Sequence, residues 1–411
     1  MASDNLTNIT PIDGRYQSKI KELSEYFSEY ALIKYRVKVE IEYFISLSEL
    51  KLFSLSQSEK EKLRKIYADF NTKDAESVKE FEKTTNHDVK AVEYFIKSKL
   101  DSLKINKNLE YIHFALTSED INNLSYSLML KDGIENAYYP VISQIYNEIK
   151  KLALENAKLP MLSRTHGQPA SPTTLGKEFV IYSKRICDMV DSLKKIKING
   201  KLNGASGNFC AHYVSYPKID WLKFSKKFIL SLGLNPNLVT YQIEPHDSIA
   251  EIFHALTRIN TVIINFNQDI WTYISQEYIG QKVIKGEVGS SAMPHKVNPI
   301  DFENSEGNLG LANAIFEFLA RKLPITRLQR DLSDSTVIRN QGTALAYTII
   351  GFKSTLKGLS KIKPLEENIK NDLEKHVEII AEAIQNILRR ENQEMPYEKL
   401  KELTRGKKVT I

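Results

Sequence analysis

Apolar residues recur at helical spacing through most of the chain, and these stripes predict long helices. The first stripe runs from Ser118 to about Ala157, and Thr117-Ser118-Glu119-Asp120 has the composition of a capped helix start with acidic residues in its first turn. Pro140 lies inside this stripe and is expected to kink the helix. The apolar positions are Ile121, Leu124, Leu128, Ile134, Tyr138, Ile142, Ile145, Ile149 and Leu152.

Four further stripes predict four more long helices. They cover approximately residues 175–196, 249–274, 301–322 and 335–359. At 1.5 Å per residue, helices of such lengths reach roughly 30–55 Å, so we expect an elongated bundle rather than a globule. The 249–274 helix also carries apolar residues off its main stripe, such as Ile252 and Trp271. This second apolar face indicates that oligomerisation buries the bundle further.

Shorter helical patterns stand on either side of the five long stripes. The sequence therefore predicts an all-α fold, with an elongated bundle of five long helices flanked by two smaller helical domains. We expect an N-terminal helical domain at residues 1–111, the central bundle at 112–363 and a C-terminal helical domain at 364–411.

Charge and composition narrow the possible partners. The 411 residues carry a net charge of +6, and their basic residues are dispersed, which argues against nucleic-acid binding and favours a small anionic substrate. No apolar run approaches the roughly 18 residues that a membrane span needs. Cys187 and Cys210 lack paired spacing, and the N-terminus lacks a signal-peptide pattern. We therefore expect a cytoplasmic protein.

Cofactor and metal motifs are incomplete in this sequence. Gly204-Ala205-Ser206-Gly207 lacks the full glycine spacing of a dinucleotide site, and no parallel-strand pattern surrounds it. His87-Asp88 and His246-Asp247 are isolated pairs, without the spaced histidines or cysteines of a zinc site. We expect neither a cofactor nor a metal ion.

Four polar segments remain as candidates for chemistry, at residues 84–88, 117–120, 163–169 and 289–299. Each alone could be a helix cap or a turn, and capping by itself explains Thr117 and Ser118. The last segment, GSSAMPHKVNP, could be a solvated linker between two helices. Its serine pair, Lys296 and Asn298 are equally suited to a mobile loop that closes over an anion.

Together the four segments resemble one family, because they match it at corresponding positions and in the same order. That family is adenylosuccinate lyase, of the fumarase/aspartase superfamily, and the resemblance extends from residues 11–16 to residues 396–407. The serine loop alone assigns only the superfamily. The residues Met-Pro-His-Lys in this loop, together with Arg15-Tyr16 and the segment 329–335, are similar to adenylosuccinate lyases of the long bacterial type. Such proteins usually continue beyond residue 407, so the C-terminal domain is expected to be shortened.

The resemblance implies β-elimination of fumarate in purine biosynthesis. The substrates would be adenylosuccinate, which gives AMP, and the succinylated aminoimidazole carboxamide ribotide SAICAR, which gives AICAR. By the same resemblance, Ser290 is the general base and His166 the general acid. A serine hydroxyl is a weak base at neutral pH, so loop closure, exclusion of water and a nearby cation such as Lys296 must activate it.

The resemblance also assigns residues to the substrate. Those that match the family's contacts to the succinyl carboxylates are Thr117, Ser118, Ser291, Lys296 and Asn298, and Gln242 matches a residue that positions the succinyl group. Those that match its phosphate and ribose contacts are Arg15, Tyr16, Arg330, Ser335 and Arg339. Asn86, His87 and Asp88 match a segment that lines the site, where His87 either touches the substrate or orders a neighbour.

The family's active sites are shared by three subunits of a homotetramer, and we expect the same arrangement here. Two alternatives stay open. Another superfamily lyase, such as argininosuccinate lyase, would carry a similar loop, although Arg330 and Arg339 argue for a phosphate-bearing substrate. A non-catalytic structural homologue would keep the fold, but the presence of Ser290, His166 and Lys296 argues against it.

Overall fold

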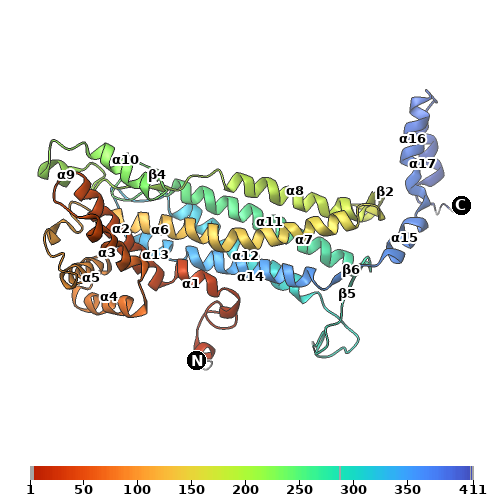
Figure 1. The fold of residues 1–411 in the computed structure, drawn as a ribbon. Helices are drawn as coiled ribbons and strands as arrows, with labels where there is room; N and C mark the ends of the chain where they lie inside the picture. The colour runs from red at the N-terminus through yellow and green to blue at the C-terminus, as the bar shows by residue number, and fades with distance from the viewer. Residues whose placement is uncertain (1–3, 287, 408, 410–411) are drawn as a thin grey trace. The chain divides into compact units, whose positions relative to one another are not determined.

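The computed structural model of the protein describes residues 4–286, 288–407 and 409 (Figure 1). The outermost residues of the predicted 1–111 and 364–411 domains lie outside these ranges, as does Glu287, two residues before the serine loop. The described chain is mostly helical with a few short strands, so the predicted all-α fold class is confirmed.

Helices dominate the order of elements. The α-helices are α1 (Ser24–Phe27), α2 (Glu29–Glu49), α3 (Gln57–Ala68), α4 (Thr72–Thr85), α5 (Asp88–Ser102), α6 (Ser118–Gly133), α7 (Tyr139–Glu155), α8 (Leu175–Leu193), α9 (Cys210–Ser215), α10 (Trp221–Ser231), α11 (Asp247–Ser275), α12 (Ile300–Lys322), α13 (Ser333–Ile338), α14 (Gln341–Leu359), α15 (Glu366–Lys375), α16 (Ala381–Arg390) and α17 (Pro396–Thr404). The strands are β1 (Pro160–Thr165), β2 (Gln168–Thr174), β3 (Asn199–Gly200), β4 (Asn235–Pro236), β5 (Ile279–Gln281) and β6 (Ile362–Pro364).

The first long stripe forms a helix that changes its winding once. Helix α6 begins at Ser118, as predicted, and the Thr117 N–H donates to Asp120 Oδ2 at 2.9 Å. After Gly133 the chain makes a π-helical turn, Ile134–Tyr138, and continues as α7. Pro140 has no N–H to donate, so the wider turn lies where the regular bonding pattern has to change.

Three of the other four long helices, α8, α11 and α12, match their predicted ranges closely. The prediction of one helix over residues 335–359 is wrong, because the chain breaks between α13 and α14. The Asn340 N–H bonds back to Val337 O at 3.0 Å, and the Thr343 N–H bonds to Asn340 O at 3.1 Å. These tight turns interrupt the helix at Arg339, whose side chain reaches Asp88 at 3.1 Å.

The described chain forms two compact units, each built from separate stretches of sequence. The first unit takes residues up to 141 together with 191–260 and 310–350, and the second takes 142–190, 261–309 and the residues from 351 onward. Helices α7, α8, α11, α12 and α14 contribute residues to both. The three domains that the sequence predicts are a different partition, and they remain a proposal.

The core of the first unit lies where α2 packs against α3, α5 and α6 (Figure 1). Leu32, Val39 and Tyr43 on α2 are buried, as are Ile121 and Leu124 on α6. Spacings of three or four residues place such side chains on one helix face, and their burial stabilises the unit through the hydrophobic effect.

The second unit contains a closed polar triangle inside its helices. Asn267 on α11 donates to Ser305 on α12 at 2.8 Å, and Thr355 on α14 donates back to Asn267 at 3.1 Å. The Ser305 and Thr355 hydroxyls are 2.8 Å apart, which closes the ring. Because all three side chains are buried, their hydrogen bonds fix the relative register of the three helices.

Among the described helices, none combines the length and apolar character that a membrane span requires.

Candidate active site

A cavity of 320 Å³ in the first unit gathers charged and hydroxyl side chains from several elements. Its lining residues are Arg36, His87, Asp88, Ser118, Asn122, Tyr126, Arg330, Leu332, Ser335, Thr336 and Arg339. Six of these, His87, Asp88, Ser118, Arg330, Ser335 and Arg339, are among the predicted substrate-binding residues. Three arginines around one small cavity suit a phosphate, because guanidinium groups bind phosphate oxygens in a bidentate geometry.

Asp88 holds two of these arginines in place. It is the first residue of α5, and its Oδ2 lies 2.7 Å from Arg36 Nη2 and 3.1 Å from Arg339 Nη2. Burial acts to raise the pKa of Asp88, but Arg36, the Val89 N–H and Arg339 together outweigh it and hold that pKa below its usual range. Arg36 is only 1% exposed, and its Nε also donates to Asn122 Oδ1 at 2.9 Å. One carboxylate therefore fixes two cations at the cavity wall.

His87 and Asn86 form the junction between α4 and α5. Asn86 ends α4 in the left-handed region, with φ 47°, which asparagine tolerates better than most residues. His87 is the N-cap of α5, and its Nδ1 accepts the Lys90 N–H at 3.2 Å. The side chain is 52% exposed, so its Nε2 edge can reach a ligand. The structure therefore permits both roles considered for His87.

Ser118 reaches the cavity from the start of α6, and Thr117 precedes it as the N-cap. The N-terminus of a 16-residue helix carries partial positive charge and free backbone N–H groups. Capping and anion binding are therefore compatible at Thr117 and Ser118.

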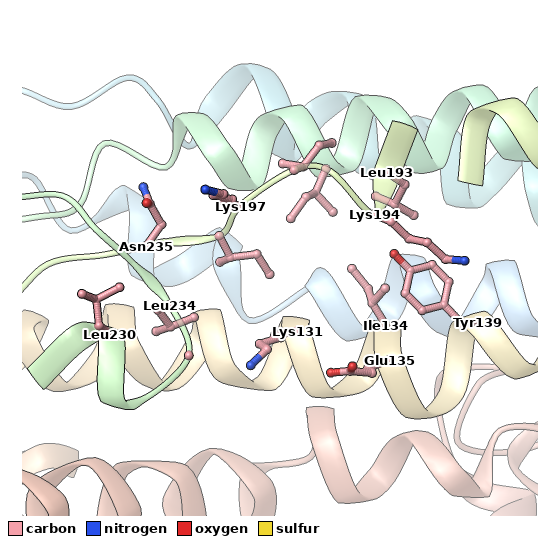
Figure 2. A pocket seen from close by; sticks show the side chains of 14 residues that line it. Lys131, Ile134, Glu135, Tyr139, Leu193, Lys194, Lys197, Leu230, Leu234 and Asn235 are labelled. Atoms are coloured by element: carbon pink, nitrogen blue, oxygen red, sulfur yellow. The ribbon is translucent and has the colours of Figure 1, made fainter. Parts of the chain in front are cut away.

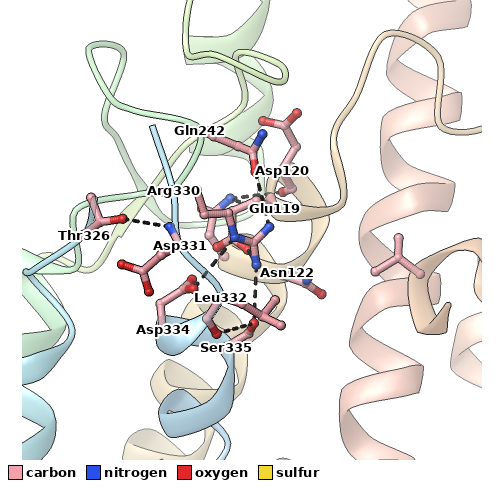
Figure 3. Close-up of polar contacts among 12 residues, drawn as sticks. Glu119, Asp120, Asn122, Gln242, Thr326, Arg330, Asp331, Leu332, Asp334 and Ser335 are labelled. Carbon is pink, nitrogen blue, oxygen red and sulfur yellow. Dashed lines mark hydrogen bonds and ion pairs between the residues drawn. The ribbon is translucent and has the colours of Figure 1, made fainter. Parts of the chain in front are cut away.

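Arg330 is the most connected cation of the cavity (Figure 3). Its Nη1 donates to Gln242 Oε1 and its Nη2 to Ser335 Oγ, each at 3.4 Å. The same Nη2 lies 3.3 Å from Glu119 Oε2, and Nε lies 3.7 Å from Asp334 Oδ1. Arg330 thus contacts two other predicted residues, Gln242 and Ser335. It also contacts the carboxyl groups of Glu119 and Asp334, which were not predicted as site residues.

Burial governs the protonation of this group. It raises the pKa of Glu119 to about 8, although Arg330 acts in the opposite direction, and it raises the pKa of Asp334 as well. Burial followed by the Arg330 charge lowers the pKa of His246 to about 4. At neutral pH Glu119 is therefore largely protonated and His246 is neutral.

Within the described residues, Glu119, His246 and Asp334 are also the group that could hold a metal ion, with ligand atoms within 4.8 Å of one another. The Arg330 guanidinium touches both carboxyl groups. A fixed positive charge between the would-be ligands repels a divalent cation, so this cluster fits an arginine better than a metal.

His166 lies in the second unit, at the tip of the β1–β2 hairpin. Thr165 pairs with Gln168, which leaves His166 and Gly167 as a two-residue turn with φ 54° and 73°. Positive φ at both positions is the signature of a type I′ hairpin turn. A non-glycine residue there costs backbone energy, and such strain is common at functional sites. The His166 side chain is exposed.

The serine loop, residues 289–299, lies in the connection between β5 and α12 (Figure 1) and forms no helix or strand, as predicted. Ser290 Oγ accepts the Met293 N–H at 3.1 Å, and Gln281 Nε2 donates to Val297 O at 2.7 Å. Ser291 and Lys296 are exposed, whereas Ser290 and Asn298 are half-buried. The loop therefore presents polar groups that a ligand could reach.

Several predicted residues are not brought together. No hydrogen bond between described atoms joins Ser290 to His166, which stand on the loop and the hairpin turn. Arg15 is exposed and Tyr16 lies beneath the Lys19 ammonium, 5.4 Å from the ring centre, and neither lines the arginine cavity. Asn86 and Thr117 flank residues that do line it.

Sequence reasoning missed Arg36, Asn122, Tyr126, Glu119 and Asp334. Arg36 and Glu40 stand one turn apart on a helix face that is otherwise apolar, and both are buried. Charged residues inside an apolar stripe are rarely buried without a partner, so this spacing was a usable signal. Glu119 gave no such signal, because an acidic residue in the first turn of a helix is common without any functional role.

A second cavity of the first unit contains none of the predicted residues. It measures 670 Å³ and is lined by Lys131, Glu135, Tyr139, Lys194 and Lys197 among apolar side chains such as Leu234 (Figure 2). Its described lining residues include no serine, threonine or arginine, in contrast to those of the first cavity.

Known proteins match this chain along its whole length. A family model described as "Lyase" matches residues 14–314, and one described as "Adenylosuccinate lyase C-terminal" matches residues 326–411. An adenylosuccinate lyase of Dictyostelium discoideum is 52% identical over 99% of this chain and 90% of its own. An adenylosuccinate lyase of Escherichia coli strain K12 is 49% identical over 100% of this chain and 91% of its own.

Solved structures share the fold at much lower identity. A fumarate lyase from Mesorhizobium sp. BNC1 superposes with a TM-score of 0.72 at 15% identity, over 93% of this chain and 84% of that one. A beta-carboxy-cis,cis-muconate cycloisomerase from Acinetobacter calcoaceticus sp. ADP1 has a TM-score of 0.71 at 18% identity, over 94% of this chain and 87% of that one. At these identities the likeness concerns the fold alone.

Proposed function

The chain belongs to the adenylosuccinate lyase family, and from this we propose that it cleaves adenylosuccinate to AMP and fumarate and SAICAR to AICAR and fumarate, in purine biosynthesis. The observation that carries the proposal is the identity of about one half with curated adenylosuccinate lyases along the whole chain. The arginine cavity adds a physical reason, because both substrates bear a phosphate.

The proposed reaction is a β-elimination. Ser290 removes a proton from the succinyl carbon next to a carboxylate, and the electron pair left on that carbon is stabilised within the carboxylate. The pair then forms the carbon–carbon double bond of fumarate as the C–N bond breaks. His166 gives a proton to the departing nitrogen. Both proton transfers use side chains, so the proposal requires no cofactor.

The succinyl end would be held by Thr117, Ser118, Gln242, Ser291, Lys296 and Asn298. Lys296 and the hydroxyl groups supply a positive charge and hydrogen-bond donors for two carboxylates, and the α6 N-terminus adds backbone donors. Closure of the serine loop over the substrate would exclude water and strengthen these contacts. The exposure of Ser291 and Lys296 leaves them accessible for that role.

The nucleotide end would lie in the arginine cavity. Arg330, Ser335 and Arg339 would hold the phosphate and ribose, with Asn86, His87 and Asp88 beside them and Arg15 and Tyr16 completing the site. Support comes from the six predicted residues that line this one cavity. Arg36 joins them as a cation that Asp88 and Asn122 hold in place.

The active sites would be shared by three subunits of a homotetramer. Large apolar side chains such as Leu154 on α7, Val180 on α8 and Trp271 on α11 are exposed on one chain. Exposed apolar residues on long helices are typical of surfaces that pack against further copies. A cytoplasmic location, expected from the sequence, is part of this proposal.

One assay separates the proposal from its alternatives. The purified protein is incubated separately with adenylosuccinate, argininosuccinate and aspartate, and fumarate release is measured. We expect fumarate from adenylosuccinate alone. Fumarate from argininosuccinate or aspartate, with none from adenylosuccinate, would refute the assignment, and no fumarate from any substrate would favour a non-catalytic homologue.

A further inference from the structure

Two buried carboxyl groups lie against the arginine that faces the cavity, and the reaction as proposed gives neither a role. The side chains of Glu119 and Asp334 are only 4% and 5% exposed, and both touch Arg330. Figure 3 shows Glu119 on α6 and Asp334 on α13 converging on its guanidinium. Arg330 therefore stands between a buried acidic layer and the cavity lined by Ser335 and Arg339.

If both carboxyl groups were ionised, they would oppose anion binding. Two negative charges against one guanidinium leave the group with a net charge of −1 beside the place where a phosphate should bind. Ionised carboxylates would also compete for the guanidinium with the phosphate oxygens. Protonation of one of the two carboxyl groups brings the net charge of this group to zero and removes the repulsion.

The surroundings of Glu119 favour its neutral form. The charged groups that face it are Arg330 and Asp334, with the buried ion pair of Lys201 and Asp120, whose atoms are 2.9 Å apart. The positive and negative charges of this pair largely offset each other. Burial then dominates and raises the pKa of Glu119 to about 8.

His246 completes the layer without adding charge. It is 1% exposed, and neither ring nitrogen has a hydrogen-bond partner among the described residues. Its ligand atom and those of Glu119 and Asp334 lie within 4.8 Å of one another. A neutral imidazole fills this space without cancelling or repelling the guanidinium charge.

We propose that Glu119 is a positioning residue for anion binding, which in its protonated form orients Arg330 toward the cavity and leaves the charge of Arg330 to the substrate phosphate. The identity of that anion as a nucleotide phosphate rests on the proposed function. A bound phosphate favours the protonated form further, so binding above neutral pH is coupled to uptake of a proton.

The coupling gives a quantitative expectation. A phosphate ester is about nine-tenths dianion at pH 7 and almost entirely dianion at pH 8.5, because its second pKa is about 6. If only the protonated Glu119 form binds, the dissociation constant for AMP rises about tenfold between pH 7 and pH 9. Net proton uptake on AMP binding should be about 0.8 proton at pH 8.5. At pH 7 it should be close to zero, because uptake by Glu119 and release from the remaining AMP monoanion nearly cancel.

The experiment is calorimetric titration of the full-length protein with AMP, and with inorganic phosphate as a second probe. Each titration is repeated in buffers of different ionisation enthalpy, which gives the proton uptake directly. Glu119→Gln keeps the neutral shape, so we expect near wild-type affinity at pH 7, no proton uptake at pH 8.5 and no loss of affinity up to pH 9. Glu119→Ala removes the contact and should weaken AMP binding roughly tenfold.

Glu110→Gln is the matched control, because its side chain is 90% exposed and it should leave proton uptake unchanged. Wild-type binding without proton uptake at pH 8.5, uptake that persists in Glu119→Gln, or failure of both probes to bind at millimolar concentration would overturn the proposal. The wild-type measurement needs no variant to fold. Fumarate release tests the proposed function separately, so an active enzyme without proton uptake contradicts only the role of Glu119.

Discussion

The side chains proposed for proton transfer and those proposed for charge binding have different surroundings. His166 is exposed on a strained hairpin turn, and the Ser290 hydroxyl has one backbone partner in the serine loop. Arg36, Asp88 and Arg330 instead stand in dense networks on or beside helices. Binding groups are therefore preorganised, whereas the proposed base requires a closed loop before its hydroxyl is activated.

At the residue scale, Ser290→Ala should slow turnover strongly without unfolding the protein. Loss of the proposed base should lower kcat for adenylosuccinate by about 10²–10⁴-fold, with KM nearly unchanged because the hydroxyl is not assigned to binding. Steady-state kinetics and thermal unfolding measure the two effects. Ser275→Ala, at the exposed end of α11, is the control and should leave kcat intact. A Ser290→Ala enzyme with wild-type kcat contradicts the role.

At the element scale, the hairpin turn places His166, and the start of α6 places the hydroxyls proposed for anion binding. The β1–β2 turn depends on two consecutive positive φ angles, which glycine adopts freely and histidine does not. The start of α6 depends on the bond from the Thr117 N–H to Asp120 Oδ2. Each proposed role therefore relies on a local backbone geometry that a single substitution can test.

Substituting two glycines that both face open space isolates the backbone effect of the turn. Gly167 has φ 73° and Gly307 lies within α12, and neither has an atom within 4 Å of an added Cβ. Gly167→Ala should lower the free energy of unfolding by about 1 kcal/mol, because alanine is disfavoured at positive φ. Gly307→Ala should raise it by up to about 1 kcal/mol, because alanine favours helix. Chemical denaturation measures both, and shifts of the same sign would contradict this account.

At the scale of the whole molecule, the predicted site residues divide between the two compact units. The first contains the arginine cavity and its neighbours, and the second contains His166, Ser290, Ser291, Lys296 and Asn298. The proposed homotetramer provides a way for such residues to meet, because each site would draw on three chains.

Mixing two inactive variants tests the shared site. Ser290→Ala and His166→Ala proteins are unfolded together in equal amounts and reassembled. If the serine and the histidine of one site come from different subunits, about a quarter of the sites should contain both intact residues, and activity should recover toward about a quarter of wild type. Each variant reassembled alone is the control. No recovery despite subunit exchange, shown by mass spectrometry of tagged chains, would refute the shared site.

The sequence by itself determined the helical fold class, three of the long helices, the start of α6 and the family. These follow from local periodicity, capping chemistry and the residues of a few short motifs, all of which are properties of contiguous sequence. The break between α13 and α14 was missed, although residues 339–343 interrupt the apolar stripe with polar side chains and a glycine, because a polar run of that length also fits an exposed turn of a continuous helix.

Only the tertiary structure decided which charges meet. Asp88 joins Arg36 and Arg339 across 52 and 251 positions of sequence, and no local pattern encodes such a pairing. It also decided that Glu119 is buried with Arg330 and Asp334, and this burial raises the pKa of Glu119. Protonation depends on desolvation and on neighbouring charges, and both exist only once distant segments have packed together.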